Sequence, residues 1–70
     1  MYKASIDTPN WGFEAYGNTE AEAREALKQG WQRHVSQTGD AAPGYLEEFE
    51  EDIMIQEVAP GMVFRDLEPL

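Results

Sequence analysis

The spacing of the apolar residues changes sharply at Gly17-Asn18-Thr19. Before this junction, apolar and polar residues alternate over 2–7 and again over 11–16, which is the period of a half-buried strand. The residues between them, Thr8-Pro9-Asn10, have the composition of a turn. After the junction, apolar residues recur every three or four positions, as on one face of a helix. The pattern predicts a β-hairpin followed by a helix.

The two ends of this helix are marked by residues that terminate helices. Thr19 can accept a hydrogen bond from the amide of Glu22, whose carboxylate can reach back to the amide of Thr19, which is the arrangement of a capping box. Gly39 is a typical stop signal. We expect a helix over residues 19–37, with an apolar stripe made of Ala23, Ala26, Leu27, Gly30, Trp31, His34 and Val35.

The C-terminal half begins with a predicted loop at residues 40–44. Residues 45–52 are ambiguous, although Tyr45, Leu46 and Phe49 have the spacing of one short helical turn pinned to the core. Two strands are then expected, at 53–58 and 62–67. Ala59-Pro60-Gly61 fits a turn between them, with Pro at its second and Gly at its third position.

The expected order is therefore strand, strand, helix, strand, strand, in a single α+β domain that spans residues 1–70. One antiparallel sheet with the helix across one face would bury both apolar stripes in a common core. The chain has no cysteine, so neither a disulfide nor a thiolate metal site can support this small core. A homodimer is left open, because self-association would add buried apolar area.

The charge of the chain excludes several functions. The chain has fourteen Asp and Glu residues and five Lys and Arg residues, which gives a net charge of -9. Nucleic acid would be repelled, so we expect no direct binding of DNA or RNA. No apolar run approaches the roughly 20 residues of a membrane span. We therefore expect a cytoplasmic protein without a membrane partner.

Catalytic chemistry has little support in the sequence. His34 is the single histidine and lies at the edge of the apolar stripe, where a packing role is the more common one. Ser5, Ser36 and Thr38 have no base at a recognisable spacing. We predict that the protein is not an enzyme and has neither a cofactor nor a specific metal site, although the run at 47–52 could attract divalent cations loosely.

The acidic segment, residues 47–52, is the most distinctive feature of the sequence. It places five acids in six residues around Phe49. Neighbouring carboxylates on a helix or strand lie about 6–7 Å apart, close to the spacing of successive phosphates along a nucleic-acid strand. The alternative is that the acids only keep a small domain soluble. The predicted partner-binding residues are Glu47, Glu48, Glu50, Glu51, Asp52 and Glu57, with Tyr16 and Tyr45 as aromatic anchors.

Residues 17–23, Gly17-Asn18-Thr19-Glu20-Ala21-Glu22-Ala23, resemble the G-[DN]-T-x-x-E-A signature of HicB-like antitoxin domains. The similarity covers roughly residues 2–37. It implies two strands before an amphipathic helix, and a domain that neutralises a small basic RNase toxin. The resemblance assigns no catalytic residue.

The overall profile is also similar to that of phage-encoded anti-CRISPR and anti-restriction proteins, which are very short, cysteine-free, acidic and α+β. That resemblance implies charge mimicry of nucleic acid. We therefore predict a non-enzymatic inhibitor whose acidic surface occupies the basic site of a nucleic-acid-binding protein, such as a CRISPR effector, a nuclease or a toxin. The alternatives are a HicB-like antitoxin and a phage structural or regulatory protein whose acidity is incidental.

Overall fold

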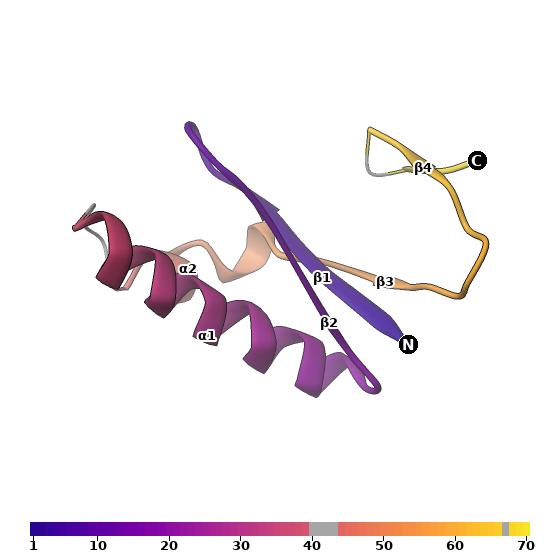
Figure 1. Ribbon diagram of the computed structural model, residues 1–70, viewed down its shortest axis with the longest axis horizontal. Coiled ribbons are helices and arrows are strands. Elements are labelled where there is room, and N and C mark those ends of the chain that lie inside the picture. The colour runs from indigo at the N-terminus through magenta and orange to yellow at the C-terminus, as the bar shows by residue number, and fades with distance from the viewer. Residues whose placement is uncertain (40–43, 67) are drawn as a thin grey trace.

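The computed structural model describes residues 1–39, 44–66 and 68–70, so most of the predicted loop at 40–44 lies outside the described residues. Two strands, a long helix, two short helices and three further strands follow one another along the chain (Figure 1). They are β1 (Tyr2–Asp7), β2 (Gly12–Gly17), α1 (Glu20–Thr38), α2 (Tyr45–Glu48), the 3-10 helix η1 (Glu50–Asp52), β3 (Met54–Glu57), β4 (Phe64–Arg65) and β5 (Glu68–Pro69).

The main sheet has the order β2-β1-β3, and both pairs are antiparallel. Ala4 of the central strand lies opposite Ala15 of β2 and Ile55 of β3, so these three side chains share one face of the sheet. Helix α1 covers that face (Figure 1). The core between the two layers is formed by Ala4, Ile6, Ala23, Leu27, Trp31 and Leu46.

Both predicted ends of the helix are confirmed. The hydroxyl of Thr19 accepts a hydrogen bond from the amide of Glu22 at 3.1 Å. At the other end Gly39 has a φ of 63°, and its amide donates to the carbonyl of Val35 at 3.0 Å. A left-handed residue at this position is a common helix stop, because glycine adopts it without steric cost.

Gly17 is required where β2 meets α1. A Cβ on this residue would lie 2.5 Å from the amide nitrogen of Ala23, which is closer than real contacts allow. The strand can therefore turn directly into the helix only because position 17 has no side chain.

The prediction of a small α+β domain with antiparallel strands is confirmed, but the prediction of a single sheet is wrong. Strand β4 pairs with β5 in a separate two-stranded sheet, with Phe64 opposite Pro69. The expected strand at 62–67 shortens to Phe64–Arg65, and residue 67 lies outside the described residues. Asp66, with a φ of 51°, turns the chain back after it.

The reason for this difference lies in the outer face of the main sheet, the one opposite α1. Lys3 and Ser5 point to this face, and both are only 3% exposed. The ring of Phe64, from the C-terminal segment, lies over the Lys3 ammonium on this face. Strand β4 therefore begins with a residue that packs on the outer face, and it pairs with β5 and not with β3, which is an outer strand of the main sheet.

Candidate acidic interface

The acidic segment forms the end of α2 and all of η1, and its five carboxylate side chains are exposed. The expected short helical turn is confirmed, with Leu46 buried in the core. The ring of Tyr45 stacks on Trp31 with centroids 5.1 Å apart, and it contacts the ring of Phe49 at 4.5 Å. One side of the segment is thus held by apolar side chains while the other presents charge.

Backbone hydrogen bonds fix the order of these carboxylates in space. The amide of Phe49 donates to the carbonyl of Tyr45, and the amide of Asp52 donates to the carbonyl of Phe49, both at 2.9 Å. The amide of Ile53 donates to the carbonyl of Glu50 at 3.2 Å and closes η1. The charged side chains therefore project from two consecutive helical turns.

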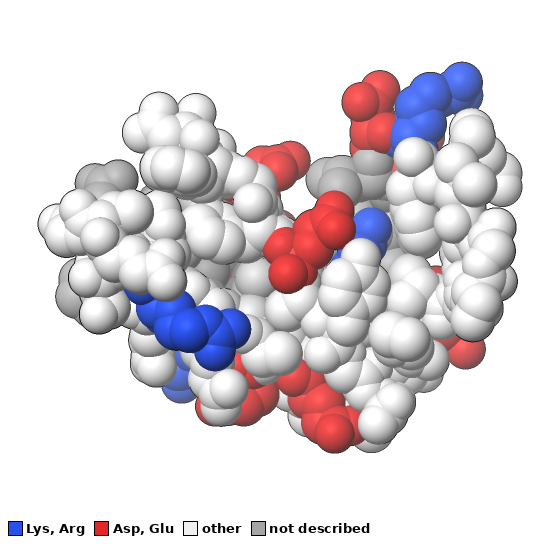
Figure 2. All heavy atoms as spheres, viewed as in Figure 1, with Lys and Arg blue, Asp and Glu red and all other residues white. Residues whose placement is uncertain are grey.

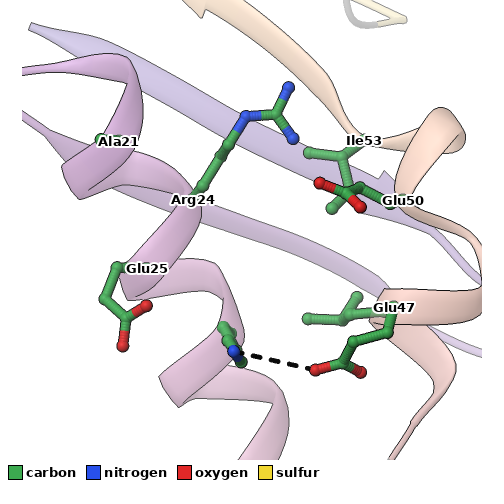
Figure 3. A pocket seen from close by; sticks show the side chains of 8 residues that line it. Ala21, Arg24, Glu25, Glu47, Glu50 and Ile53 are labelled. Carbon is green, nitrogen blue, oxygen red and sulfur yellow. Dashed lines mark ion pairs between the residues drawn. The ribbon is translucent and has the colours of Figure 1, made fainter.

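A groove of about 360 Å³ separates the acidic segment from α1 (Figure 3). Glu47 and Glu50 form one wall of the groove, and Arg24 and Lys28 come from the helix. The Lys28 Nζ lies 3.9 Å from Glu47 Oε1, and both side chains are about half exposed. Water and salt screen such a pair, so it contributes about 0–1 kcal/mol.

Arg24 extends from α1 across the groove toward Ile53 and Glu50 (Figure 3). In the described parts of the chain, Lys28–Glu47 is the ion pair that involves the acidic segment. Most of the charge on α2 and η1 is therefore available to a partner.

The eight predicted partner-binding residues do not form one surface. Tyr45 and the five carboxylates of residues 47–52 lie together on α2 and η1. Glu57 is exposed on β3 opposite Tyr2, and Tyr16 is on β2 opposite Lys3. Tyr45 is half-buried in its stack on Trp31, so it anchors the acidic segment to the core.

Tyr16 is exposed, as its position on the strand predicts, and its hydroxyl donates a hydrogen bond to Glu14 Oε2 at 3.2 Å. Partial burial of the hydroxyl and the neighbouring Glu14 carboxylate both raise the pKa of Tyr16 above 10.0. Burial and a nearby negative charge both disfavour the phenolate, and the carboxylate also holds the phenolic proton.

His34 belongs to a row of aromatic rings. Its imidazole centroid lies 5.0 Å from Trp11, 5.0 Å from Phe13 and 5.2 Å from Trp31. The side chain is half-buried among these rings, which supports the packing role expected from its place beside the apolar stripe.

The sequence analysis missed Arg24, Lys28 and Lys3. The helical spacing of Arg24 and Lys28 puts them on one side of α1, but the sequence could not show that the acidic segment would pack there. Lys3 belongs to a strand predicted to be half-buried, and the Phe64 ring that lies against it comes from the far end of the chain.

Figure 2 shows that one face of the molecule carries both signs of charge, with basic atoms over α1 and acidic atoms nearby. In residues 1–39, 44–66 and 68–70, no group of three or more His, Asp or Glu side chains is placed to hold a metal ion. None of the described helices has an apolar stretch long enough to cross a membrane. The chain matches no protein-family model, no curated protein and no solved structure.

Proposed function

We propose that this protein is a non-enzymatic binding module that covers the basic nucleic-acid site of a protein partner with its acidic segment. In the leading version the partner is a CRISPR effector or another nuclease, and the protein acts as an inhibitor in the cytoplasm of a bacterial host. The observation that carries the proposal is the placement of five exposed carboxylates on a segment anchored by Leu46 and Tyr45.

An anchored acidic surface suits this task better than a mobile acidic tail. A disordered segment loses conformational freedom when it binds, which lowers its affinity. Here Leu46, Tyr45 and the backbone bonds of α2 and η1 have already fixed the backbone that carries the carboxylates in the free protein. On a helix, side chains three or four positions apart lie about 6 Å from one another. Basic residues of a phosphate-binding groove can match that spacing.

The proposal is tested by competition with nucleic acid. The protein is immobilised and exposed to the basic, heparin-binding fraction of a bacterial lysate at low salt. A partner held by the acidic segment is released by a short duplex oligonucleotide, and its binding weakens steeply with salt. Retention in the presence of saturating oligonucleotide would show that the two do not share a site.

Two variants with equal net charge locate the surface. The first is the triple substitution Glu48→Gln, Glu50→Gln and Glu51→Gln in the acidic segment. The matched control is Glu20→Gln, Asp66→Asn and Glu68→Gln, which removes the same charge from exposed positions elsewhere. The proposal requires the first variant to lose binding and the control to retain most of it. Equal losses would indicate that net charge alone attracts the partner.

A HicB-like antitoxin is the second candidate, and the junction between β2 and α1 favours it. The residues of the signature, from Gly17 to Ala23, lie where two strands lead into an amphipathic helix, as that resemblance implies. The partner would then be a small basic RNase. A reading frame for such a toxin beside the gene, and rescue of its toxicity by this protein, would distinguish this candidate from the first.

A further inference from the structure

Strand β2 has an open edge. In the described part of the chain it pairs with β1 and lies at the border of the sheet. The amide of Thr8 donates to the carbonyl of Trp11, which sets the alternation of the ladder that follows. In an antiparallel pair, every second residue of a strand bonds to its neighbour. Because Thr8 and Trp11 form a bonded pair, the amides and carbonyls of Phe13 and Ala15 face β1, whereas those of Glu14 and Tyr16 face away from the sheet.

This edge has few of the devices that proteins use to block strand addition. Natural edge strands are shortened, bulged, or supplied with proline or lysine. Strand β2 is six residues long, Gly12–Gly17, contains neither Pro nor Lys, and pairs with β1 in an unbroken register. Its single charged side chain is that of Glu14.

A groove runs along the same edge, between β2 and α1. One hollow of about 260 Å³ is lined by Phe13–Tyr16 of the strand and by Ala26, Gly30 and Arg33 of the helix, among others. A second hollow of about 510 Å³ continues it toward the start of α1. The two share Tyr16 and Ala26, so together they follow the strand along its length.

Small residues keep this groove open on the helix side. A Cβ on Gly30 would meet a single atom within 4 Å, the Nη2 of Arg33, at 3.9 Å. Ala26, one turn before it, adds a methyl group. Side chains of an added strand therefore have room above α1.

The charge of the groove selects the kind of strand that fits it. Glu22, Glu25 and Arg33 of α1 line the groove, and Glu14, which also borders it, directs its side chain to the outer face of the sheet beside Tyr16. Figure 2 shows acidic atoms on this side of the molecule, over β2 and near the start of α1. A second copy of this chain would bring the same carboxylates and a net charge of -9 to the contact, which disfavours self-pairing.

We propose that the groove between β2 and α1 binds an extended basic segment of a protein partner, which adds to the sheet as a further strand beside β2. Main-chain hydrogen bonds to Glu14 and Tyr16 hold the segment, and Lys or Arg side chains contact the groove carboxylates. This surface differs from the acidic segment, whose groove lies on the side of α1 that carries Arg24 and Lys28, although Glu25 borders both grooves. The proposal therefore goes beyond the function proposed above and stands without it.

The probe is an acetylated and amidated octapeptide in which Lys and Val alternate. Binding to the full chain is measured by calorimetry, and amide hydrogen exchange is followed by NMR. We expect slower exchange at Glu14 and Tyr16 when the peptide is bound. The amides of Phe13 and Ala15 already face β1, so their exchange should change much less. A peptide of identical charge with N-methylated valines lacks the donors needed for strand addition, and we expect it to bind about tenfold more weakly.

Three variants of the protein make the test specific. Glu14→Pro removes the outward amide, and Glu14→Ala is its control because it removes the charge but keeps the amide. The missing amide does not belong to the β1 ladder, so edge proline is compatible with the fold. Glu14→Pro should bind more weakly than Glu14→Ala. Gly30→Leu fills the groove from the helix side, where a Cβ would meet only Arg33 Nη2 within 4 Å, and it should also weaken binding.

Three outcomes would overturn the proposal. The first is equal binding of the N-methylated peptide. The second is loss of binding in the triple Gln variant of the acidic segment but not in Gly30→Leu, which would place the peptide on α2 and η1. The third is a dimer in sedimentation whose Glu14 and Tyr16 amides are protected before any peptide is added, because the occupant would then be a second copy.

Discussion

The ammonium nitrogen of Lys3 lies 3.8 Å from the centroid of the Phe64 ring. This contact joins the central strand of the main sheet to the first residue of the small C-terminal sheet. Lys3 is almost fully buried, and Phe64, more than 60 positions away in the sequence, contributes to its cover. The face of an aromatic ring attracts a cation, most strongly where water is excluded.

A double-mutant cycle measures this contact. Phe64→Leu should reduce the free energy of unfolding more in the presence of Lys3 than in a Lys3→Met background, with a coupling of about 0.5–2 kcal/mol. Urea denaturation followed by tryptophan fluorescence gives the four values. Val63→Ala, at an exposed neighbouring position, is the control and should change stability by less than about 0.5 kcal/mol. Zero coupling would mean that Phe64 acts by apolar cover alone.

Leu46 should be the side chain that keeps the acidic segment in place. Leu46→Ala removes a buried side chain from the core and is expected to cost about 2–4 kcal/mol. Glu48→Ala, two positions later and exposed, should cost less than about 0.5 kcal/mol. Thermal and urea unfolding of the two variants checks both values. Similar stabilities would show that α2 is not anchored by the core.

The junction between β2 and α1 should tolerate little change at Gly17. Gly17→Ala forces a methyl group against the backbone at Ala23, so the strand or the helix start must shift, at a cost of about 1–3 kcal/mol. Gly44→Ala is the matched control, because a Cβ there meets nothing within 4 Å. Thr19→Ala, which removes the helix cap, should cost about 1 kcal/mol. Circular dichroism melts of the three variants rank the effects.

Tyr16 should titrate above its ordinary range. Burial and Glu14 raise its pKa above 10.0, so the folded protein holds the phenolic proton more tightly than the unfolded chain does. The resulting stability is complete below pH 10.0 and is lost as the pH rises through the folded-state pKa. NMR of the ring carbon that bears the hydroxyl follows the titration. Glu14→Gln should lower the midpoint, whereas Glu20→Gln should leave it unchanged.

The elements predicted correctly from the sequence are those specified by neighbouring residues. Thr19 and Gly39 mark the helix ends through bonds to residues three or four positions away. Likewise, Pro60 and Gly61 form the predicted turn, in which the amide of Met62 donates to the carbonyl of Ala59. Gly61 has a φ of 89°, which the third position of such a turn requires.

The pairing of the last strand could not be predicted in the same way. The sequence predicts a strand at residues 62–67, but the residues of a strand do not by themselves identify its neighbour in the sheet. Strand β4 pairs with β5 and not with β3, and Phe64 lies over Lys3, a residue more than 60 positions earlier in the sequence.

The same contrast between local and long-range interactions applies to the candidate site. Charge density correctly grouped Glu47 through Asp52, because these residues are adjacent in the chain. It could not separate Glu57 and Tyr16 from them, since their positions follow from strand pairing. The open edge at Glu14 and Tyr16 depends on the order of the strands, so it became visible only in the fold.

The apolar and the acidic side chains of residues 45–52 have separate roles, and this separation has an evolutionary consequence. Leu46 and Tyr45 hold the segment, while the carboxylates on α2 and η1 point to solvent and take no part in the core. Substitutions among these acids therefore cost little stability, whereas substitution of the buried Leu46 costs much more. The charged surface can therefore change quickly in evolution while the backbone that carries it stays the same.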